Sequence, residues 1–388
     1  MSWPLVAIKE FCQTGSGGTP SRKVAEYYDG DIPWIKSGDL RENVVTQAAE
    51  FITELAVKKS SAKLVPKGAI LLAMYGATVG RMAMLGIDAA TNQAVCAVMP
   101  DPNRANARYV YYALLSKVPE FLRSAVGGAQ PNISQGLIKD TKIPLPPLAE
   151  QKRIAAILDK ADALRRKRQQ AIELADQFLR SVFLDMFGDP VTNPKGWEIH
   201  NIHDACLEIV DCVNRTAPVV DYETPYKMIR TTNVRNYEID LSGVRYVEKE
   251  SYLNWTRRLL PKKGDIIFTR EAPAGEAGII ETDDKVFLGQ RTMHFRPDNS
   301  KVTSEFMLYE LMGEGIKQQI NRMSTGSTVK HLSVPECKKF SIRMPPIELQ
   351  ERFSEIVSKI KSLRSKCLNS RIDIEECFNS ISRDAFSG

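Results

Sequence analysis

The stretch IPLPPLAEQ at residues 143–151 returns as IRMPPIELQ at residues 342–350, 199 positions later. The match continues at the same offset through a long helical pattern. It ends where three residues of the first copy have counterparts in the second: Ser181, Asp185 and Phe187 match Ser380, Asp384 and Phe386. This repeat predicts a chain built from two copies of one unit, with internal pseudo-two-fold symmetry. Such a molecule suits a target that itself has two halves, and duplex DNA is the obvious example.

Weaker echoes of the repeat lie upstream of both copies. Ile133-Ser134 matches Leu332-Ser333, KGAI at 67–70 matches KGDI at 263–266, and IKSGDL at 35–40 matches IRTTNV at 229–234. The duplicated unit therefore takes up about half of the chain.

The bulk composition indicates an ordinary globular protein. At 388 residues the chain predicts two to three domains. A net charge of +6 is compatible with a polyanionic partner but does not require one. The seven cysteines are scattered without a C-x-x-C pair, which favours a reducing compartment. With no visible signal peptide and no apolar run long enough to span a bilayer, we expect a cytoplasmic protein without a membrane partner.

Four segments follow one another along the chain. Residues 1–147 and 191–346 mix short apolar runs with Gly, Pro and Asn, which predicts two globular domains of strands, loops and short helices. Residues 148–187 and 347–386 contain no Pro or Gly, and each follows a pair of prolines. We therefore expect two long helices, within spacer segments 148–190 and 347–388.

The apolar residues of these helices recur at alternating steps of three and four, which is typical of a coiled-coil seam. The predicted seam consists of Ile154, Ile157, Leu164, Phe178, Val182, Phe353, Ile356, Ile360, Leu363, Ile374 and Ile381. Because the first helix enters the second domain and the second helix leaves it, the two seams pair when the helices run antiparallel. The alternative is that each helix packs elsewhere or joins copies of the chain. The predicted fold is thus α+β: two similar mixed α/β domains separated by an antiparallel coiled coil.

The order of globular domain and helix, twice over, resembles the specificity subunit of type I restriction–modification enzymes. The resemblance covers essentially the whole chain, and several strings carry it: TGSGGTPSRKVAEYYDGDIPWIKSGDL at 14–40, TNQAVCAV at 91–98, NISQGLIKDTKIPLPPLAEQKRIAAIL at 132–158, FGDP at 187–190, YKMIRTTNV at 226–234, KKGDIIFTREAPAGEAGII at 262–280 and GQRTMHFRP at 289–297. The second copy departs from the first, because it lacks GGTPSR and has LGQRT in place of TNQAV.

The resemblance implies that each globular domain is a target-recognition domain for one half of a bipartite double-stranded DNA sequence. It also implies that the helices set the spacing and dock two methylation subunits, and that restriction subunits join later. The chain would then be non-catalytic and bind no cofactor or metal, with S-adenosylmethionine, ATP and Mg expected on the partner subunits.

The candidate DNA-contacting residues lie in three kinds of loop. They are Thr19, Ser21, Arg22 and Lys23 in a glycine-rich loop; Lys36 and Ser37, matched by Arg230, Thr231, Thr232 and Asn233; and Tyr75 and Arg81, with Arg270 and Arg291, where the halves differ on a shared frame. Backbone N–H groups and cations suit phosphates, and Arg and Asn suit guanine and adenine. The alternatives are tight turns, side chains that cap their own backbone, and a surface ion pair between Arg270 and Glu271 or Glu276.

Other chemistries find little support in the sequence. No Walker or S-adenosylmethionine motif is visible, and Asp283-Asp284-Lys285 is only a fragment of a nuclease metal site. His200, His203, Cys206 and Cys212 lack the paired spacing that zinc sites usually show. The alternative functions are a self-sufficient DNA methyltransferase or nuclease with a fused recognition region, and a coiled-coil scaffold that binds proteins.

Overall fold

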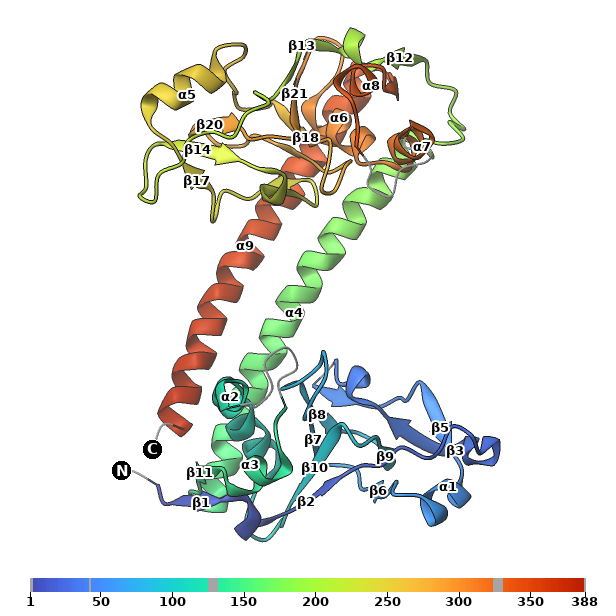
Figure 1. Ribbon diagram of the computed structural model, residues 1–388, viewed down its shortest axis with the longest axis vertical. Helices are drawn as coiled ribbons and strands as arrows, with labels where there is room; N and C mark the ends of the chain where they lie inside the picture. The colour runs from blue at the N-terminus through green and yellow to red at the C-terminus, as the bar shows by residue number, and fades with distance from the viewer. Residues whose placement is uncertain (1–2, 42, 125–131, 324–330, 387–388) are drawn as a thin grey trace. The chain divides into compact units, whose positions relative to one another are not determined.

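The computed structural model describes residues 3–41, 43–124, 132–323 and 331–386, without the side chains of residues 371 and 372. The chain divides into two compact units, Met1–Gln169 with Asn369–Gly388, and Gln170–Leu368. Each of the two long helices therefore gives one half to each unit (Figure 1). Among the described residues, no helix combines the length and apolarity that a membrane crossing requires.

The first unit contains two main sheets. The larger has the strand order β2-β10-β7-β8-β4 and the smaller β5-β3-β9-β6, while β1 pairs with β11 near the start of the long helix. The strands are β1 (Leu5–Ala7), β2 (Cys12–Ser16), β3 (Tyr28–Ile35), β4 (Val44–Val45), β5 (Glu50–Ile52), β6 (Leu64–Val65), β7 (Ile70–Ala73), β8 (Met82–Leu85), β9 (Ala89–Thr91), β10 (Val95–Pro100) and β11 (Lys142–Pro144). Strand β7 is buried at every position, because its two faces contribute to two different apolar clusters.

Short helices link these strands. They are η1 (Ile8–Glu10), η2 (Ala25–Tyr27), η3 (Ser37–Asp39), α1 (Glu54–Lys59), α2 (Ala107–Ser124) and α3 (Gln135–Asp140). Helix α2 covers the larger sheet with a buried run that includes Tyr109, Tyr112 and Leu114.

The second unit repeats this plan with strand orders β13-β21-β18-β19 and β17-β14-β20, a β15-β16 hairpin, and a β12-β22 pair. The strands are β12 (Ile199–Asn201), β13 (Cys206–Asp211), β14 (Tyr226–Ile229), β15 (Val234–Arg235), β16 (Glu238–Ile239), β17 (Arg245–Tyr246), β18 (Ile266–Thr269), β19 (Ala277–Ile279), β20 (Lys285–Leu288), β21 (Thr292–Pro297) and β22 (Ser341–Arg343). The helices are η4 (Ile202–Ala205), η5 (Thr231–Asn233), α5 (Lys249–Thr256), α6 (Ser304–Leu311), α7 (Glu314–Met323) and α8 (Val334–Cys337).

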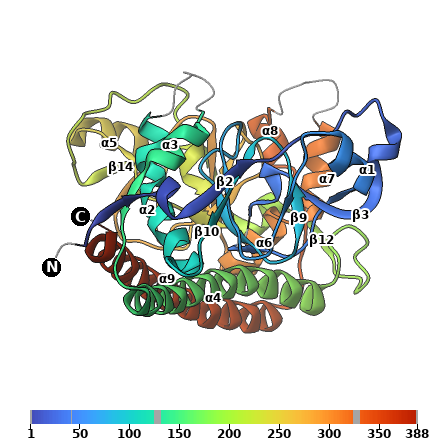
Figure 2. The ribbon, with the colours of Figure 1, turned by 90° about the horizontal axis from the view of Figure 1, so that it is seen from below.

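The long helices are α4 (Leu148–Phe187) and α9 (Ile347–Phe386), in the ranges that the absence of Pro and Gly predicts. In the first unit the guanidinium of Arg165, on α4, lies 5.5 Å from the ring centre of Phe378, near the end of α9. In the second unit the ring centres of Phe183, near the end of α4, and Phe353, near the start of α9, are 5.4 Å apart. The two helices therefore run antiparallel, side by side in both views (Figures 1 and 2).

The buried face of each helix differs from the predicted seam. Of the predicted residues, Ile154 and Phe353 are buried, whereas Val182, Ile356, Ile360, Ile374 and Ile381 are half-buried. Four others are exposed, namely Ile157 at 37%, Leu164 at 49%, Phe178 at 50% and Leu363 at 56%. On α4 the residues one position later, Leu158, Leu179 and Phe183, are buried instead. The heptad rule assumes that a helix faces only its partner, but here each helix also packs on the apolar core of a unit, which turns its buried face by one residue.

A buried ion pair lies beside the C-terminus of α4 in the second unit. Arg343, on β22, donates to both carboxylate oxygens of Glu310, at 3.0 and 2.8 Å. Its Nη1 also donates to the carbonyls of Phe187 and Gly188, at 2.9 and 2.8 Å. These carbonyls belong to the helix C-terminus, where no intrahelical donor remains. Arg343 therefore joins the end of α4 to the sheet and to α6.

Candidate nucleic-acid interface

In both units, two parallel strands end at the same edge of the smaller sheet. Strand β3 pairs in parallel with β9, with Ile35 opposite Thr91, and β14 pairs in parallel with β20, with Ile229 opposite Leu288. Beyond these ends, the Asn92 N–H donates to the Ile35 carbonyl at 3.0 Å, and the Gly289 N–H donates to the Ile229 carbonyl at 2.7 Å. The equivalent bond holds two turns together in each unit.

Two more backbone hydrogen bonds bring further loops to this edge in the first unit. The Met74 N–H donates to the Ala94 carbonyl at 2.8 Å, and the Ile133 N–H donates to the Met74 carbonyl at 2.7 Å. Four segments far apart in the sequence therefore meet.

The second unit makes the same two bonds. The Arg270 N–H donates to the Arg291 carbonyl at 2.8 Å, and the Leu332 N–H donates to the Arg270 carbonyl at 3.1 Å. We call the meeting segments the rim of each unit. The first rim comprises residues 36–39, 74–77, 92–94 and 132–134, and the second comprises residues 230–233, 270–273, 289–291 and 331–333.

The two rims present different side chains on this common backbone frame. The matched pairs are Lys36 and Arg230, Asp39 and Asn233, Met74 and Arg270, Tyr75 and Glu271, Ala94 and Arg291, and Asn132 and His331. Asn132 and His331 are not among the residues predicted from the sequence to contact DNA. The match of Ile133-Ser134 to Leu332-Ser333 already placed them at equivalent positions, and that was the signal that could have found them.

The first turn of each rim is capped by its own fourth residue. The Lys36 N–H donates to Asp39 Oδ2 at 2.8 Å, and the Arg230 N–H donates to Asn233 Oδ1 at 3.0 Å. Asn233 is only 5% exposed, and its Nδ2 donates to the Asp240 carbonyl at 3.0 Å. Asn233 is thus a structural residue rather than a base reader, because both of its polar atoms are used inside the unit.

The other side chains of these turns remain candidates for DNA contact. Ser37 and Thr231 are half-buried and Thr232 is exposed. Arg230 is half-buried and donates from Nη2 to the Gly243 carbonyl at 3.2 Å. Lys36 forms an ion pair with Glu50 at 2.5 Å between Nζ and Oε1.

Two backbone N–H groups of the glycine-rich loop are used inside the unit. The N–H groups of Gly17 and Gly18 donate to the carbonyls of Val95 and Thr91, at 3.1 and 2.9 Å. A Cβ on Gly17 would lie 2.1 Å from the Thr91 oxygen, so glycine is needed here for close packing. This corrects, for Gly17 and Gly18, the prediction that backbone N–H groups of the loop approach DNA phosphates.

The side chains after these glycines are exposed at Thr19, Ser21, Arg22 and Lys23. Arg22 pairs with Glu50 at 2.5 Å, and its guanidinium lies 4.4 Å from the centre of the Tyr28 ring. Hydrogen bonds from Lys36 and then from Arg22 hold the pKa of Glu50 below its ordinary value. Arg22 and Lys36 therefore share one carboxylate, and each must leave it or extend past it to reach a phosphate.

The candidates of the third group, Tyr75, Arg81, Arg270 and Arg291, differ in exposure. Tyr75 is half-buried and Arg81 exposed in the first unit. In the second unit Arg270 is only 9% exposed, and its Nη1 donates to the Leu332 carbonyl at 2.9 Å. Arg270 thus ties two rim segments together, and its burial disfavours the predicted role as a base or phosphate reader. The predicted ion pair of Arg270 with Glu271 or Glu276 is not observed among the described residues, because Glu271 pairs with its neighbours instead.

Arg291 does stand at the surface of the second rim. Its side chain is 57% exposed, and its Nε lies 3.2 Å from Glu271 Oε2. The other oxygen of Glu271, Oε1, is in contact with Nδ1 of His331. One carboxylate therefore holds both a cation and an imidazole at the edge of the rim.

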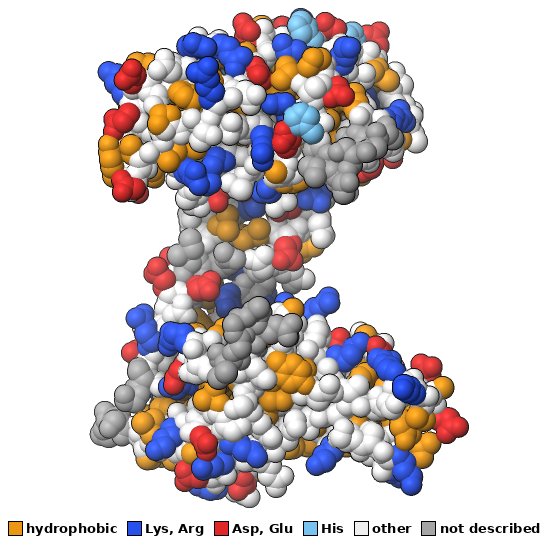
Figure 3. All heavy atoms as spheres, viewed as in Figure 1, with side chains coloured by type: hydrophobic (Ala, Val, Ile, Leu, Met, Phe, Trp, Pro, Cys, Tyr) orange, Lys and Arg blue, Asp and Glu red, His pale blue; other side chains and the backbone are white. Residues whose placement is uncertain are grey.

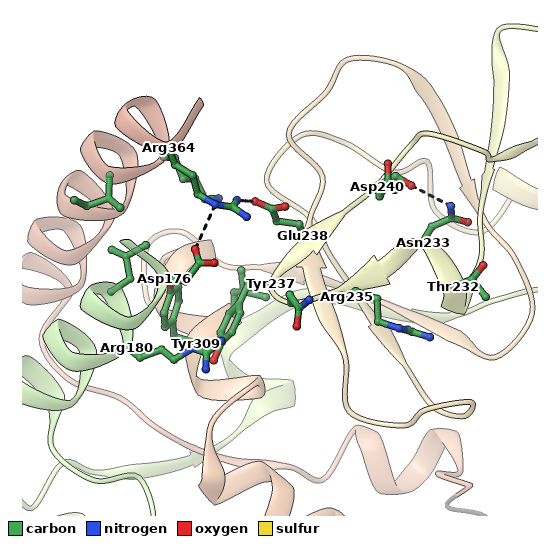
Figure 4. Close-up of a pocket in the computed structure, with 15 residues that line it drawn as sticks. Asp176, Arg180, Thr232, Asn233, Arg235, Tyr237, Glu238, Asp240, Tyr309 and Arg364 are labelled. Carbon is green, nitrogen blue, oxygen red and sulfur yellow. Dashed lines mark hydrogen bonds and ion pairs between the residues drawn. The ribbon is translucent and has the colours of Figure 1, made fainter. Parts of the chain in front are cut away.

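Each unit ties the segment that follows its first rim turn to a long helix. In the second unit Arg364, on α9, forms ion pairs with Asp176, on α4, and with Glu238, on β16 (Figure 4). These residues line a cavity of about 500 Å³, together with Arg180 and Tyr237. The sequence did not indicate this network, which links β16 to the helices.

The first unit uses Asn43 for the same purpose. Asn43 is 8% exposed, and its Nδ2 donates to Asp162 Oδ2, on α4, at 2.5 Å. Asn43 Oδ1 in turn accepts a hydrogen bond from Arg108, on α2. The first rim turn is therefore followed by a buried polar link to α4, whereas in the second unit the link runs from Glu238, which is 50% exposed, to Arg364 on α9.

Charge and metal chemistry add no competing site among the described residues. Lys and Arg side chains are interspersed with Asp and Glu over the face drawn in Figure 3, rather than gathered in one basic patch. No group of three or more His, Cys, Asp or Glu is arranged to hold a metal ion in the described part of the chain. His200 lies 3.2 Å from Glu198, and burial raises the pKa of Cys206 to about 12, which disfavours a metal-binding thiolate.

Known proteins show the same architecture. Residues 2–174 and 194–375 each match the model of the type I restriction modification DNA specificity domain. The chain is 25% identical over 383 residues to the type I restriction enzyme MjaIX specificity subunit of Methanocaldococcus jannaschii, which covers 92% of this chain and 86% of that one. It is 36% identical over 154 residues to the EcoR124I/EcoR124II specificity subunit of Escherichia coli, over 38% of each chain.

A solved structure agrees over the whole length. The crystal structure of the type I restriction–modification system S subunit from M. genitalium superimposes with a TM-score of 0.63 at 15% identity, covering 100% of this chain and 96% of that one. This likeness concerns the fold. Since the two matched regions span most of the sequence and include both rims, the chain belongs to the family of type I restriction–modification DNA specificity proteins.

Proposed function

We propose that each unit reads one half of a bipartite DNA sequence with its rim, on behalf of a multi-subunit enzyme that methylates and cleaves DNA. The observation that carries this proposal is the pair of rims: three equivalent backbone hydrogen bonds hold four matched segments in each unit, while the side chains on them differ. Two readers with one scaffold and different side chains suit two different half-sites, because base edges are distinguished by side-chain donors and acceptors.

The exposed apolar residues of the long helices support a second part of the proposal. Ile157 and Leu164 in the first unit, and Leu174 and Phe178 in the second, are 37–55% exposed on α4. Exposed apolar side chains along a helix are typical of a protein interface. We assign this face to the docking of two methylation subunits, which restriction subunits then join.

In this proposal the chain recognises DNA and leaves catalysis to its partners. S-adenosylmethionine, ATP and Mg are then bound by the partner subunits. Incubating the pure chain with DNA and S-adenosylmethionine tests this division. Methyl transfer in the absence of a partner subunit would favour the alternative of a self-sufficient methyltransferase.

The experiment that tests two-part reading is an exchange of residues 1–147 for the corresponding domain of a homologue. The hybrid is assembled with methylation subunits, and modified bases are mapped in genomic DNA. We expect one half of the recognised sequence to change and the other to stay. A change in both halves would contradict independent readers, and failure to bind DNA even with methylation subunits would favour a protein-binding scaffold.

A further inference from the structure

Arg291 has a backbone conformation that favours glycine. It lies in the turn between β20 and β21 with φ at +69°, in the left-handed region that residues with a Cβ rarely occupy. The hydrogen bond from the Arg270 N–H to the Arg291 carbonyl, at 2.8 Å, holds the turn in place. Strained conformations of this kind persist where the surroundings impose them, and they cluster at functional sites. Glycine would suit this backbone better, so a long exposed side chain here indicates that the side chain itself has a function.

The side chain of Arg291 has N–H donors on Nη1 and Nη2 that form no hydrogen bond with a described residue. Glu271 lies 3.2 Å from Nε, and among the described residues none accepts a hydrogen bond from Nη1 or Nη2. Glu271 is itself held from the other side by His331 Nδ1, and its side chain is only 20% exposed. The carboxylate therefore limits the rotation of the guanidinium, while Nη1 and Nη2 keep N–H donors for a ligand.

A guanidinium held at Nε presents two parallel N–H donors, and among the base edges of the major groove these match the N7 and O6 acceptors of guanine. Adenine places an N–H donor beside its N7, and cytosine also presents a donor. A phosphate could accept the same pair of donors, but the adjacent Glu271 carboxylate disfavours a second anion, whereas a base edge is uncharged.

We infer that Arg291 reads a guanine of the second half-site, with Glu271, supported by His331, as the positioning residue. This inference rests on the proposed function and deepens it. It predicts at least one G·C pair in the half of the target that the second unit recognises.

The left-handed backbone permits a sharp test, because Arg291→Gly removes the side chain and suits the conformation. The full chain is assembled with methylation subunits, and the target is defined by mapping methylated bases. Binding is then measured on duplexes in which each guanine of the second half is replaced by adenine in an A·T pair, or by 7-deazaguanine, which lacks N7. A bidentate contact corresponds to a preference of roughly 5- to 150-fold for the correct base.

We expect the wild type to lose affinity with either replacement at one position. Arg291→Gly is expected to bind all forms of that position equally, while keeping its preferences at every other position and the unfolding temperature of the wild type. Arg257→Ala, which removes another exposed cation of the second unit at the end of α5, is the control and should leave every preference in place.

Glu271→Ala separates positioning from a merely structural role. Loss of the carboxylate should lower discrimination at the same position and raise affinity for unrelated DNA, because one negative charge has left the interface. A structural role alone would instead weaken binding to every sequence and lower the unfolding temperature.

Three results would overturn the inference alone. One is a second half-site without a G·C pair. Another is an Arg291→Gly complex with unchanged preferences. The last is a uniform loss on all sequences with a shallower salt dependence, which is the behaviour of a phosphate contact. A wild-type complex with no preference at any position of the second half would overturn the proposed function as well, so the two failures are distinguishable.

Discussion

Gln151 Oε1 accepts a hydrogen bond from the backbone N–H of Asn106 at 2.8 Å. Asn106 in turn caps the start of α2, since its Oδ1 accepts from the Tyr109 N–H at 3.1 Å. The Nε2 of Gln151 donates to the carbonyls of Arg104 and Pro146, at 3.1 and 2.8 Å. The glutamine of the first PPLAEQ motif therefore joins the start of α4 to the start of α2.

The second copy makes the same joint. Gln350 Oε1 accepts from the Thr303 N–H at 3.0 Å, and Thr303 caps α6. Its Nε2 donates to the carbonyls of Lys301 and Pro345, at 3.2 and 2.8 Å. Both glutamines are fully buried. The two motifs therefore make equivalent hydrogen bonds, each joining the start of a long helix to the start of α2 or α6 in its own unit.

Gln151→Ala and Gln350→Ala should each destabilise the unit to which the residue belongs. Each change leaves one N–H and two carbonyls buried without a partner, which costs about 1–3 kcal/mol for a buried polar group. The free energy of unfolding from denaturant titration measures this. Gln177→Ala, on the exposed face of α4, is the matched control and should change stability by less than about 0.5 kcal/mol.

Two leucines six residues apart on α4 test which face of the helix is buried. Leu158 is 0% exposed and Leu164 is 49% exposed. Leu158→Ala should lower the free energy of unfolding by about 2–5 kcal/mol, because it removes buried methyl groups and leaves a cavity. Leu164→Ala should cost under about 1 kcal/mol in the isolated chain. If both variants lowered the free energy of unfolding equally, the burial of Leu158 rather than Leu164 would be contradicted, and the seam predicted from the heptads would be favoured.

Asp265 should make the second unit sensitive to acid. Burial raises its pKa, but hydrogen bonds from Arg296 and His294 outweigh burial and lower the pKa from 3.8 to about 2. Because the folded value lies below the unfolded one, Asp265 contributes stability above about pH 4 that is lost as the pH falls towards 2. The difference corresponds to about 2 kcal/mol.

Asp265→Asn should therefore be less stable than the wild type at neutral pH, and the gap should narrow between about pH 4 and 2. Unfolding free energies at several pH values measure it. Asp283→Asn, an exposed carboxylate of the same unit, should show little effect at any pH. A constant gap across the range would mean that Asp265 acts through packing rather than charge.

A fragment of residues 1–190 should form a two-fold dimer. It lacks Phe378 and Phe386, which are 8% and 4% exposed in the core of the first unit. Leu179 and Phe187 lie 199 positions earlier, on the part of α4 that the fragment retains. A second copy can therefore supply both, and each such burial is worth about 1.5–3 kcal/mol.

Sedimentation tests this dimer. With methylation subunits added, methylation mapping should find an interrupted palindrome made of the first half-site and its inverted copy. A well-folded monomer at micromolar concentration would contradict the exchange of helix halves between copies.

The sequence by itself determined the repeat, the two helix ranges and the antiparallel pairing. Those features depend on local signals, because a run without Pro or Gly, bounded by a proline pair, permits a long helix whatever packs against it. The order of segments then decides the direction of each helix. The matched strings at residues 35–40 and 229–234 also placed the first rim turn of each unit correctly.

Only the tertiary structure decided which helix face is buried and which polar side chains remain free. Along α4, Ile157 and Leu158, Phe178 and Leu179, and Val182 and Phe183 are adjacent apolar pairs, so periodicity cannot choose between two stripes that lie one residue apart. Burial depends on the distant segments that cover a face. For the same reason the sequence could not show that Arg270 is buried and that its Nη1 donates to the carbonyl of Leu332, 62 residues away. Asn233 differs, because its partners, the Arg230 N–H and the Asp240 carbonyl, are close in the sequence.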